Sequence, residues 1–299
     1  MMSIKDIFPA LQDYCFHEED LKNYTSFRIG GPAEVLIKPK SKNDLIKIWE
    51  KCKENNISLT ILGDGSNVLV SDNGIRGVVV ITNGMNKIEI KENCRVYAEA
   101  GARLSKVAET ACINSLKGLE FASGIPGTIG GAVYMNAGAY GHDISEFCET
   151  VTLLNSEGEI IFKPANEMNF DYRKSYAAEN NVIILGATLK LSQGNMSEIR
   201  EEMKTLNKKR KDSQPLDKRS AGSTFKRPKE YFAGKLIEES GLKGFNIGDA
   251  KVSEKHAGFV INDGNATAKD VVQLMEFIAK KVYENYNVKL EPEVRILGG

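Results

Sequence analysis

The chain of 299 residues is longer than a single hydrophobic core usually serves, so two or three domains are expected. Its 41% hydrophobic and 27% charged residues are typical of a globular protein and exclude a disordered or membrane-embedded chain. Lysine plus arginine and aspartate plus glutamate each number 40, which excludes the broad basic field that binding to nucleic acid or to an acidic membrane usually needs. Local charge must therefore meet any anionic ligand.

Cysteine and histidine usage argues against several kinds of site. The five cysteines are odd in number and contain no Cys-x-x-Cys pair, so they predict neither a disulfide framework nor a zinc site. With three histidines in the chain, no metal site and no histidine-based triad is expected. Residues Met1 to Asp6 lack the basic and apolar stretches of a signal peptide, and the longest apolar runs have only strand length. We expect a cytoplasmic protein with reduced thiols.

The first part of the chain alternates between strand and helix patterns. A helix that begins after Ser41 and ends near Asn55 is expected between strands at 34–39 and 58–62. Further strands are predicted at 78–82, 87–90 and 95–99, followed by a helix at 105–115. Beyond a glycine-rich stretch, strands are predicted at 151–154, 159–162 and 182–191, with a hairpin turn at 155–158. This first module is therefore expected to mix α and β structure.

A charged helix and a proline mark the expected domain boundary. The helix starts at Asn195 and ends near Arg210, and Gln214-Pro215 stops it. The basic run 208–211 follows acidic residues on this helix, so it is interpreted as a solvated face and not as a nucleic-acid site. Beyond the boundary, the pattern predicts a helix at 234–240, strands at 251–253 and 258–261, a helix at 268–285 capped by Thr267, and a final strand at 288–296.

Two glycine-rich loops are candidates for binding a diphosphate. One is Gly63-Asp64-Gly65-Ser66-Asn67, after a predicted strand, and the other runs from Ser123 to Gly131. Glycine has no Cβ, so backbone N–H groups can approach a phosphate closely. Neither loop completes a Rossmann fingerprint, because Val68 stands where the third glycine belongs. Either loop alone could be a tight turn, but two in one module favour a dinucleotide without identifying it.

Six segments, in this order along the chain, resemble the UDP-N-acetylenolpyruvoylglucosamine reductase family. They are Asn-Tyr-Thr-Ser-Phe-Arg-Ile-Gly-Gly at 23–31, Leu-Gly-Asp-Gly-Ser-Asn-Val-Leu-Val at 62–70, the glycine-rich segment 124–138, Asp-Tyr-Arg-Lys-Ser at 171–175, Ala-Gly-Ser-Thr-Phe-Lys at 221–226 and Leu-Glu-Pro-Glu-Val-Arg at 290–295. The resemblance covers nearly the whole chain. The interval between Arg173 and Ser223 is short and lacks an inserted loop that carries a tyrosine, which is similar to the shorter branch of the family.

The resemblance implies an α+β fold. It consists of an FAD-binding module of the vanillyl-alcohol-oxidase type, with two α+β subdomains, and a smaller C-terminal α+β substrate domain. We therefore expect the FAD module at 1–210 with subdomains at about 1–82 and 83–210, the substrate-binding domain at 211–288, and a strand at 289–299 that returns to the FAD module. The implied cofactor-binding residues lie in or after the two glycine loops: Gly63, Asp64, Gly65, Ser66, Asn67, Gly124, Ile125, Gly127, Thr128, Gly130, Gly131 and Asn136.

The implied reaction is the NADPH-dependent reduction, through FAD, of UDP-N-acetylglucosamine enolpyruvate to UDP-N-acetylmuramate in peptidoglycan precursor synthesis. NADPH reduces the flavin, and a hydride then passes to the enolpyruvyl C3 of the UDP-sugar. Negative charge develops at C2, beside a carboxylate, so the site needs cations or acids near that carboxylate and a proton donor for C2. The expected cofactors are FAD and NADPH, and the expected partner is the UDP-sugar, without nucleic acid or membrane. The sequence predicts no particular oligomeric state.

Three polar residues match the catalytic positions of the family. By resemblance Ser223 is the proton donor, a role in which general acid catalysis contributes about 10²–10⁴ in rate. Arg173 and Glu293 resemble the pair that flanks the substrate carboxylate, with Arg173 as a planar fork of donors and Glu293 as a neutral acid. A helix or turn cap for Ser223 and a surface ion pair for the other two are the structural alternatives. Glu291 rivals Glu293, because strand alternation would place both on one face.

Six further residues are secondary candidates for substrate contact, and a purely structural role is an equal alternative for each of them. They are Tyr172, Lys211, Arg227, His256, Asn262 and Arg295. An alcohol or aldehyde oxidase on the same fold is one alternative function, although neither histidine nor cysteine occurs in the glycine loops, where a covalent flavin link would be expected. A flavin-binding regulatory protein without turnover is the other alternative.

Overall fold

In the computed structural model, residues 7–8 and 14–299 are described, and the chain forms two compact units. Unit 1 contains residues 36–64 and 77–210 together with the segment before residue 17, and unit 2 contains residues 17–35, 65–76 and 211–299. The expectation for Met1 to Asp6 lies outside the described residues. The expected domain limits remain a prediction. The change from unit 1 to unit 2 after Arg210 falls within helix α5 (Met196–Ser213), which ends just before Gln214-Pro215.

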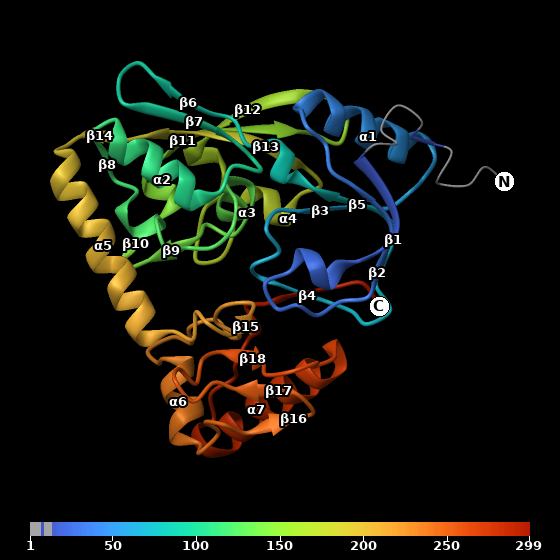
Figure 1. Ribbon diagram of the computed structural model, residues 1–299, viewed down its shortest axis with the longest axis vertical. Helices are drawn as coiled ribbons and strands as arrows, with labels where there is room; N and C mark the ends of the chain where they lie inside the picture. The colour runs from blue at the N-terminus through green and yellow to red at the C-terminus, as the bar shows by residue number, and fades with distance from the viewer. Residues whose placement is uncertain (1–6, 9–13) are drawn as a thin grey trace. The chain divides into compact units, whose positions relative to one another are not determined.

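A five-stranded antiparallel sheet forms the centre of unit 1. Its strand order is β12 (Ile160–Pro164), β11 (Cys148–Leu154), β13 (Ile183–Lys190), β7 (Arg95–Glu99) and β6 (Ile88–Lys91). Helices α2 (Leu104–Ile113), α3 (Ile129–Tyr134) and α4 (Tyr176–Glu179) lie on one side of this sheet (Figure 1). The buried core includes Val107 of α2, Val133 of α3 and Val151 of β11. The predicted strands and hairpin of this region are thus confirmed, with ends shifted by a few residues.

Shorter sheets and a further helix complete the fold. A four-stranded sheet has the order β1 (Cys15–Asp20), β2 (Pro32–Ile37), β5 (Ile75–Ile81) and β3 (Leu59–Leu62), and β3 is parallel to β5. Helix α1 (Lys42–Glu54) begins at the predicted N-cap, because Ser41 Oγ accepts the N–H of Asp44. The two-stranded pairs are β8 (Leu116–Lys117) with β14 (Ser192–Gln193), and β9 (Gly138–Ala139) with β10 (His142–Asp143).

Five 3-10 turns connect these elements. They are η3 (Leu21–Tyr24), η4 (Thr82–Gly84), η5 (Glu120–Ala122), η6 (Ile144–Glu146) and η7 (Ala165–Glu167). The turn η6 has a capping box. The Asp143 side chain accepts a backbone N–H of the turn, and the Glu146 side chain accepts the backbone N–H of Asp143. The capping box thus bonds both ends of the turn that carries the N–H of Ser145.

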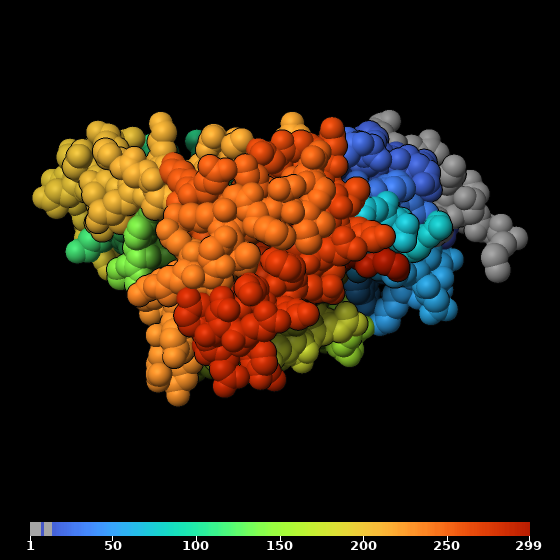
Figure 2. Space-filling view, turned by 90° about the horizontal axis from the view of Figure 1, so that it is seen from below, coloured from blue at the N-terminus to red at the C-terminus, as the bar shows by residue number. Residues whose placement is uncertain are grey.

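Unit 2 is built on a small antiparallel sheet and two helices. The sheet order is β15 (Arg219–Ser220), β18 (Val260–Asn262), β17 (Ala250–Val252) and β16 (Asn246–Ile247). Helices α6 (Ala233–Glu239) and α7 (Ala268–Tyr286) share one core with the sheet, and Thr267 caps α7 as predicted. Figure 2 shows the C-terminal residues, orange to red, as one continuous mass of packed side chains. A parallel pair, β4 (Val68–Val70) with β19 (Arg295–Leu297), also belongs to unit 2.

The predicted final strand at 288–296 is wrong in its extent. Only Arg295–Leu297 pairs as a strand, whereas Pro292 makes an isolated bridge with Phe225. Proline has no backbone N–H to donate to a ladder, so it interrupts the strand at that point. Hydrogen bonds on either side of Pro292 still attach the segment, because Lys226 N donates to Glu291 O and Glu293 N donates to Thr224 O.

Burial makes most of the cysteine thiols unreactive. Cys52, Cys112 and Cys148 are buried, whereas Cys15 and Cys94 are partly exposed, and all five are free thiols. Burial raises the pKa of Cys52 and of Cys148 to about 12, so both stay protonated at neutral pH. Within the described part of the chain, no helix is long and apolar enough to cross a membrane.

Candidate cofactor and substrate site

Gly63, the first residue of the first glycine loop, packs against the second loop within unit 1. A Cβ atom on Gly63 would collide with Oγ1 of Thr128 and lie 3.1 Å from its Cγ2. Thr128 is buried, and its Oγ1 also accepts the N–H of Gly131 at 3.5 Å, at the start of α3. The close packing requires glycine at position 63. The structure therefore brings together the two segments that the sequence indicated separately.

The second loop is open on the side of Gly131. A Cβ atom on Gly131 would have Thr128 Oγ1, at 3.9 Å, as its nearest neighbour among the described residues. Gly130, in contrast, lies against Ala100, and Gly127 has a φ of 123°, which favours glycine. The backbone at Gly131 is therefore accessible to a ligand while its neighbours are held by packing. Such a cradle fits the diphosphate of FAD.

Asp64 and two partners that the sequence interpretation missed line the first loop. Asn83 Nδ2 donates to Asp64 Oδ1 at 2.9 Å, and Arg103 Nε lies 3.4 Å from Asp64 Oδ2. The backbone of Arg103 also bridges that of Thr128, so this exposed cation lies next to both loops. It is a local positive charge of the kind that could meet a diphosphate in a chain with no net charge. No motif identifies Arg103, because its position depends on a tertiary contact.

A second missed cation, Arg210, lies beside Gly124. A Cβ on Gly124 would be 3.3 Å from Arg210 Cδ and would collide with Asn207 Oδ1, while Asn207 Nδ2 donates to Ser123 Oγ at 3.1 Å. Burial lowers the pKa of the Arg210 guanidinium. The interpretation of 208–211 as a solvated face is therefore wrong for Arg210, although Lys208, Lys209 and Lys211 are exposed. The spacing from buried Ile199 and Met203 indicates the buried face of α5 and could have identified it.

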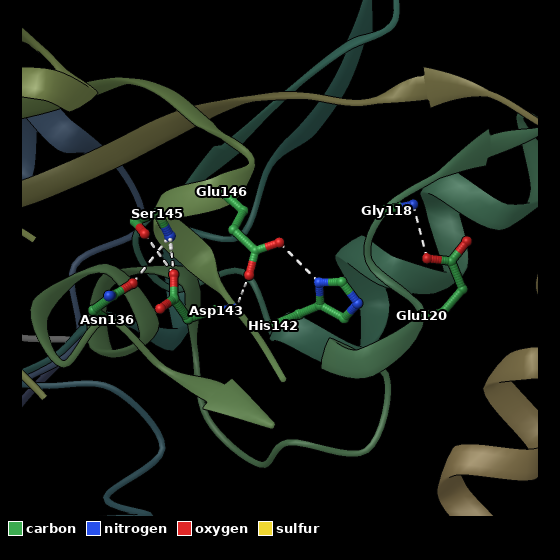
Figure 3. A network of polar contacts seen from close by, with 7 residues as sticks. All are labelled: Gly118, Glu120, Asn136, His142, Asp143, Ser145 and Glu146. Atoms are coloured by element: carbon green, nitrogen blue, oxygen red, sulfur yellow. Dashed lines mark hydrogen bonds and ion pairs between the residues drawn. The ribbon is translucent and has the colours of Figure 1, made fainter. Parts of the chain in front are cut away.

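Arg173 occupies a tight turn in unit 1. The backbones of Asp171 and Lys174 exchange hydrogen bonds of 3.2 and 3.1 Å, and Arg173 has a φ of 57°, in the left-handed region. The Arg173 guanidinium lies 4.9 Å from the centre of the exposed Tyr172 ring. The side chain of Asn136, expected at the cofactor, is engaged within the chain. Its Oδ1 accepts Ser145 N–H at 3.0 Å (Figure 3), and its Nδ2 donates to Asp171 O at 3.3 Å.

Ser223 and Glu293 are brought close together in unit 2 through Thr224. Thr224 is 2% exposed, its O accepts Glu293 N–H at 2.9 Å, its N donates to Gly258 O, and its Oγ1 accepts Val260 N–H. Ser223 and Glu293 are both partly exposed. Beside Ser223, Gly222 has a φ of 77°, and no described atom lies within 4 Å of the position of its missing Cβ. The fold thus leaves open space at Gly222, the residue before Ser223.

The first glycine loop continues into the surroundings of Glu293. Asn67 Nδ2 donates to Glu293 O at 3.1 Å, and Arg295 N donates to Asn67 O at 3.0 Å. Glu291 is different, because its side chain is 74% exposed and pairs with Lys226 at 3.2 Å. The two glutamates therefore differ in exposure, since Glu293 is only partly exposed.

The secondary substrate candidates have different surroundings. Asn262 is buried, with Nδ2 donating to Phe27 O and Oδ1 accepting the N–H groups of Gly264 and Ala266, so it has a structural role. Lys211, Arg227 and Arg295 have exposed side chains in unit 2. His256 is partly buried, and its Nδ1 accepts the N–H of Gly258 at 3.0 Å. Burial lowers the pKa of His256.

Comparison with known proteins agrees with this arrangement. Residues 33–162, which include both glycine loops, match an FAD binding domain family, and residues 214–297 match the C-terminal domain of UDP-N-acetylenolpyruvoylglucosamine reductase. Fold and glycine loops together define a flavin-dependent oxidoreductase with an FAD module and a second α+β domain.

The UDP-N-acetylenolpyruvoylglucosamine reductases of Caldanaerobacter subterraneus subsp. tengcongensis and Clostridium novyi are 51% and 52% identical to this chain. The alignments cover 94% and 93% of the chain and 92% and 90% of those proteins. The crystal structure of the Thermus caldophilus reductase has a TM-score of 0.81 and 33% identity, covering 95% of this chain and 98% of that one. The chain belongs to the UDP-N-acetylenolpyruvoylglucosamine reductase family. The predicted resemblance, fold class and FAD cofactor are thereby confirmed.

Replacing Gly131 with alanine distinguishes an effect on FAD binding from an effect on the stability of the fold. Alanine fits the space within the protein and favours a helix by about 0.5–1 kcal/mol relative to glycine. We expect Gly131→Ala to keep or raise the melting temperature of the FAD-free protein, while the Kd for FAD rises at least about tenfold. Gly63→Ala is the matched comparison, because its collision with Thr128 should lower both stability and FAD affinity. Wild-type FAD binding by Gly131→Ala would show that the cofactor does not approach this glycine.

The lowered pKa of His256 predicts an acid-sensitive unit 2. Neutral His256 stabilises the fold above its unfolded pKa of about 6.5, and this stability is lost as the pH falls below that value. Protonation also removes the acceptor for Gly258 N–H. Between about pH 7.5 and about pH 5, the melting temperature of His256→Gln should fall less than that of the wild type.

His142 provides the control of opposite sign for this measurement. The hydrogen bond that His142 donates to the Glu146 carboxylate raises the pKa of His142, so its contribution is complete at low pH and is lost as the pH rises through the folded pKa. His142→Gln should therefore lose more stability than the wild type on acidification. An identical pH response of His256→Gln and wild type would contradict the role given to His256.

Proposed function

We propose that the protein catalyses the NADPH-dependent reduction of UDP-N-acetylglucosamine enolpyruvate to UDP-N-acetylmuramate, a cytoplasmic step of peptidoglycan precursor synthesis. When bound, FAD accepts a hydride from NADPH and supplies it to the enolpyruvyl group. The observation that carries the proposal is the association of Ser223 and Glu293 through Thr224 in a member of this reductase family. The cofactor cradle at Gly63 and Gly131 supports the same function.

Each polar residue of the proposed site has a separate task. Ser223 donates a proton to C2, and the open space at the neighbouring Gly222 supports access of a substrate to this segment. Arg173 stabilises the carboxylate of the enediolate with a forked set of donors. Glu293, partly buried, stays neutral beside that negative charge and donates a hydrogen bond to it. Glu291 is not used, because it is exposed and paired with Lys226.

Replacement of Ser223 tests the assignment of the proton donor. Ser223→Ala should leave bleaching of the bound flavin by NADPH nearly intact, while return of the yellow colour on adding the enolpyruvyl UDP-sugar slows at least about a hundredfold. Both rates are measured by anaerobic stopped-flow absorbance. Equal slowing of the two rates would remove Ser223 from this role. Wild-type colour that does not return with substrate would contradict the reductase activity itself.

A pair of glutamate variants tests the choice between Glu291 and Glu293. Glu293→Gln keeps the shape of the side chain but removes its ionisable carboxyl group. The substrate-dependent rate should therefore fall about tenfold to a thousandfold, and its pH profile should change. Glu291→Gln removes only an exposed ion pair, and its rates should stay within about twofold of wild type. The reverse ranking of the two variants would transfer the role to Glu291.

A further inference from the structure

The turn that carries Arg173 is attached on both flanks to the end of α3. On one side Asn136 Nδ2 donates to Asp171 O at 3.3 Å. On the other side Ser175 Oγ donates to Tyr134 O at 2.7 Å, and Ser175 is fully buried. The remaining turn residues Asp171, Tyr172 and Lys174 are exposed. Two side chains that are not in contact with solvent therefore connect an otherwise exposed turn to the helix.

The turn has a conformational reason to need this support. Arg173 adopts a left-handed backbone with a φ of 57°, which a non-glycine residue rarely adopts unless its surroundings impose it. Its long side chain amplifies any change in backbone direction at the guanidinium. The hydrogen bonds within the turn, between Asp171 and Lys174, define its shape but not its position relative to the rest of unit 1.

The side-chain oxygen of Asn136 is also hydrogen-bonded, which holds the amide in one orientation. Asn136 is 3% exposed, and its Oδ1 accepts Ser145 N–H at 3.0 Å. Ser145 belongs to the capping box of η6, and Glu146 of that box also bonds to His142 Nδ1 at 2.8 Å (Figure 3). Ser145 N–H is shared between Asn136 Oδ1 and Asp143 Oδ1, and a flip of the Asn136 amide would place its NH2 group against this donor and its oxygen against Asp171 O, so both Asn136 bonds would be lost. Asn136 thus joins a rigid segment to the Arg173 turn.

We propose that Asn136 and Ser175 are positioning residues that fix the Arg173 turn relative to the flavin loop carried at the other end of α3. The inference rests on the proposed role of Arg173 toward the substrate carboxylate. It also gives Asn136 a role different from the cofactor contact expected from the sequence. A charge-stabilising group is effective only when it is already in place, and a misplacement of about 1 Å can cost about a hundredfold in rate.

Three single variants of the FAD-bound enzyme separate the possible roles. Asn136→Asp keeps an oxygen for Ser145 N–H but loses the donor to Asp171 O. Ser175→Ala loses the donor to Tyr134 O on the opposite flank and stays decisive if the first variant does not fold. Ser145→Ala is the matched control, because it removes the hydroxyl that bonds to Asp143 but keeps the N–H that bonds to Asn136.

Both positioning variants should change the turn and only the substrate-dependent rate. Amide hydrogen exchange of residues 171–175 should become faster in Asn136→Asp and in Ser175→Ala but not in Ser145→Ala. Flavin reoxidation by the enolpyruvyl UDP-sugar should slow by about tenfold to a hundredfold. Bleaching by NADPH and the Kd for FAD should stay within about twofold of wild type.

A double variant shows whether Asn136 acts through Arg173. Arg173→Ala alone should slow reoxidation by substrate, and adding Asn136→Asp to it should cause little further slowing, because the group being positioned is already gone. Multiplication of the two effects would overturn the inference. Loss of FAD affinity, or equal slowing of both half-reactions in Asn136→Asp, would also overturn it and make Asn136 a cofactor residue. A full rate in Arg173→Ala would instead refute the proposed role of Arg173, on which the inference rests.

Discussion

The packing of Gly63 against Thr128 is the constraint on which unit 1 depends. Any side chain at position 63 would collide with the Thr128 hydroxyl, which also receives the N–H of Gly131 at the start of α3. One buried threonine therefore contacts Gly63 of the first loop and caps the start of α3. Residues at and just after the far end of α3 bond to the Arg173 turn, so this helix connects the glycine contact with the segment that carries the arginine.

Unit 2 has a comparable centre in Thr224. Its backbone and hydroxyl bond to Glu293, Gly258 and Val260, so the segment that carries Ser223 cannot move independently of the C-terminal segment. Asn67 adds a connection from the first glycine loop to the same glutamate. The proposed acid and the proposed proton donor are thus placed by residues to which the proposal gives no chemical part in the reaction. This separation of placement from chemistry explains why small, buried polar residues surround the proposed catalytic groups.

Local signals were sufficient to predict much of the fold. The caps at Ser41 and Thr267 and the stop at Pro215 depend on neighbouring residues, so the ends of α1, α5 and α7 could be predicted closely. The extent of the strand predicted at 288–296 could not be predicted in this way, because a pattern of alternating residues does not reveal that Pro292 lacks the N–H needed for strand pairing. Arg103 was missed because its proximity to the loops arises from tertiary packing, whereas the helical spacing of Arg210 from Ile199 and Met203 could have indicated its burial. Family resemblance, rather than periodicity, identified Arg173, Ser223 and Glu293.

The acidity of the buried thiols has a practical consequence. With a pKa of about 12, only about one in 10⁵ of the Cys52 and Cys148 side chains is ionised at neutral pH, and the thiolate is the reactive form. Alkylating reagents and oxidants should therefore modify these two positions extremely slowly while the protein is folded. Labelling that suddenly extends to them would report opening of the interior, which makes the native cysteines built-in probes of unfolding.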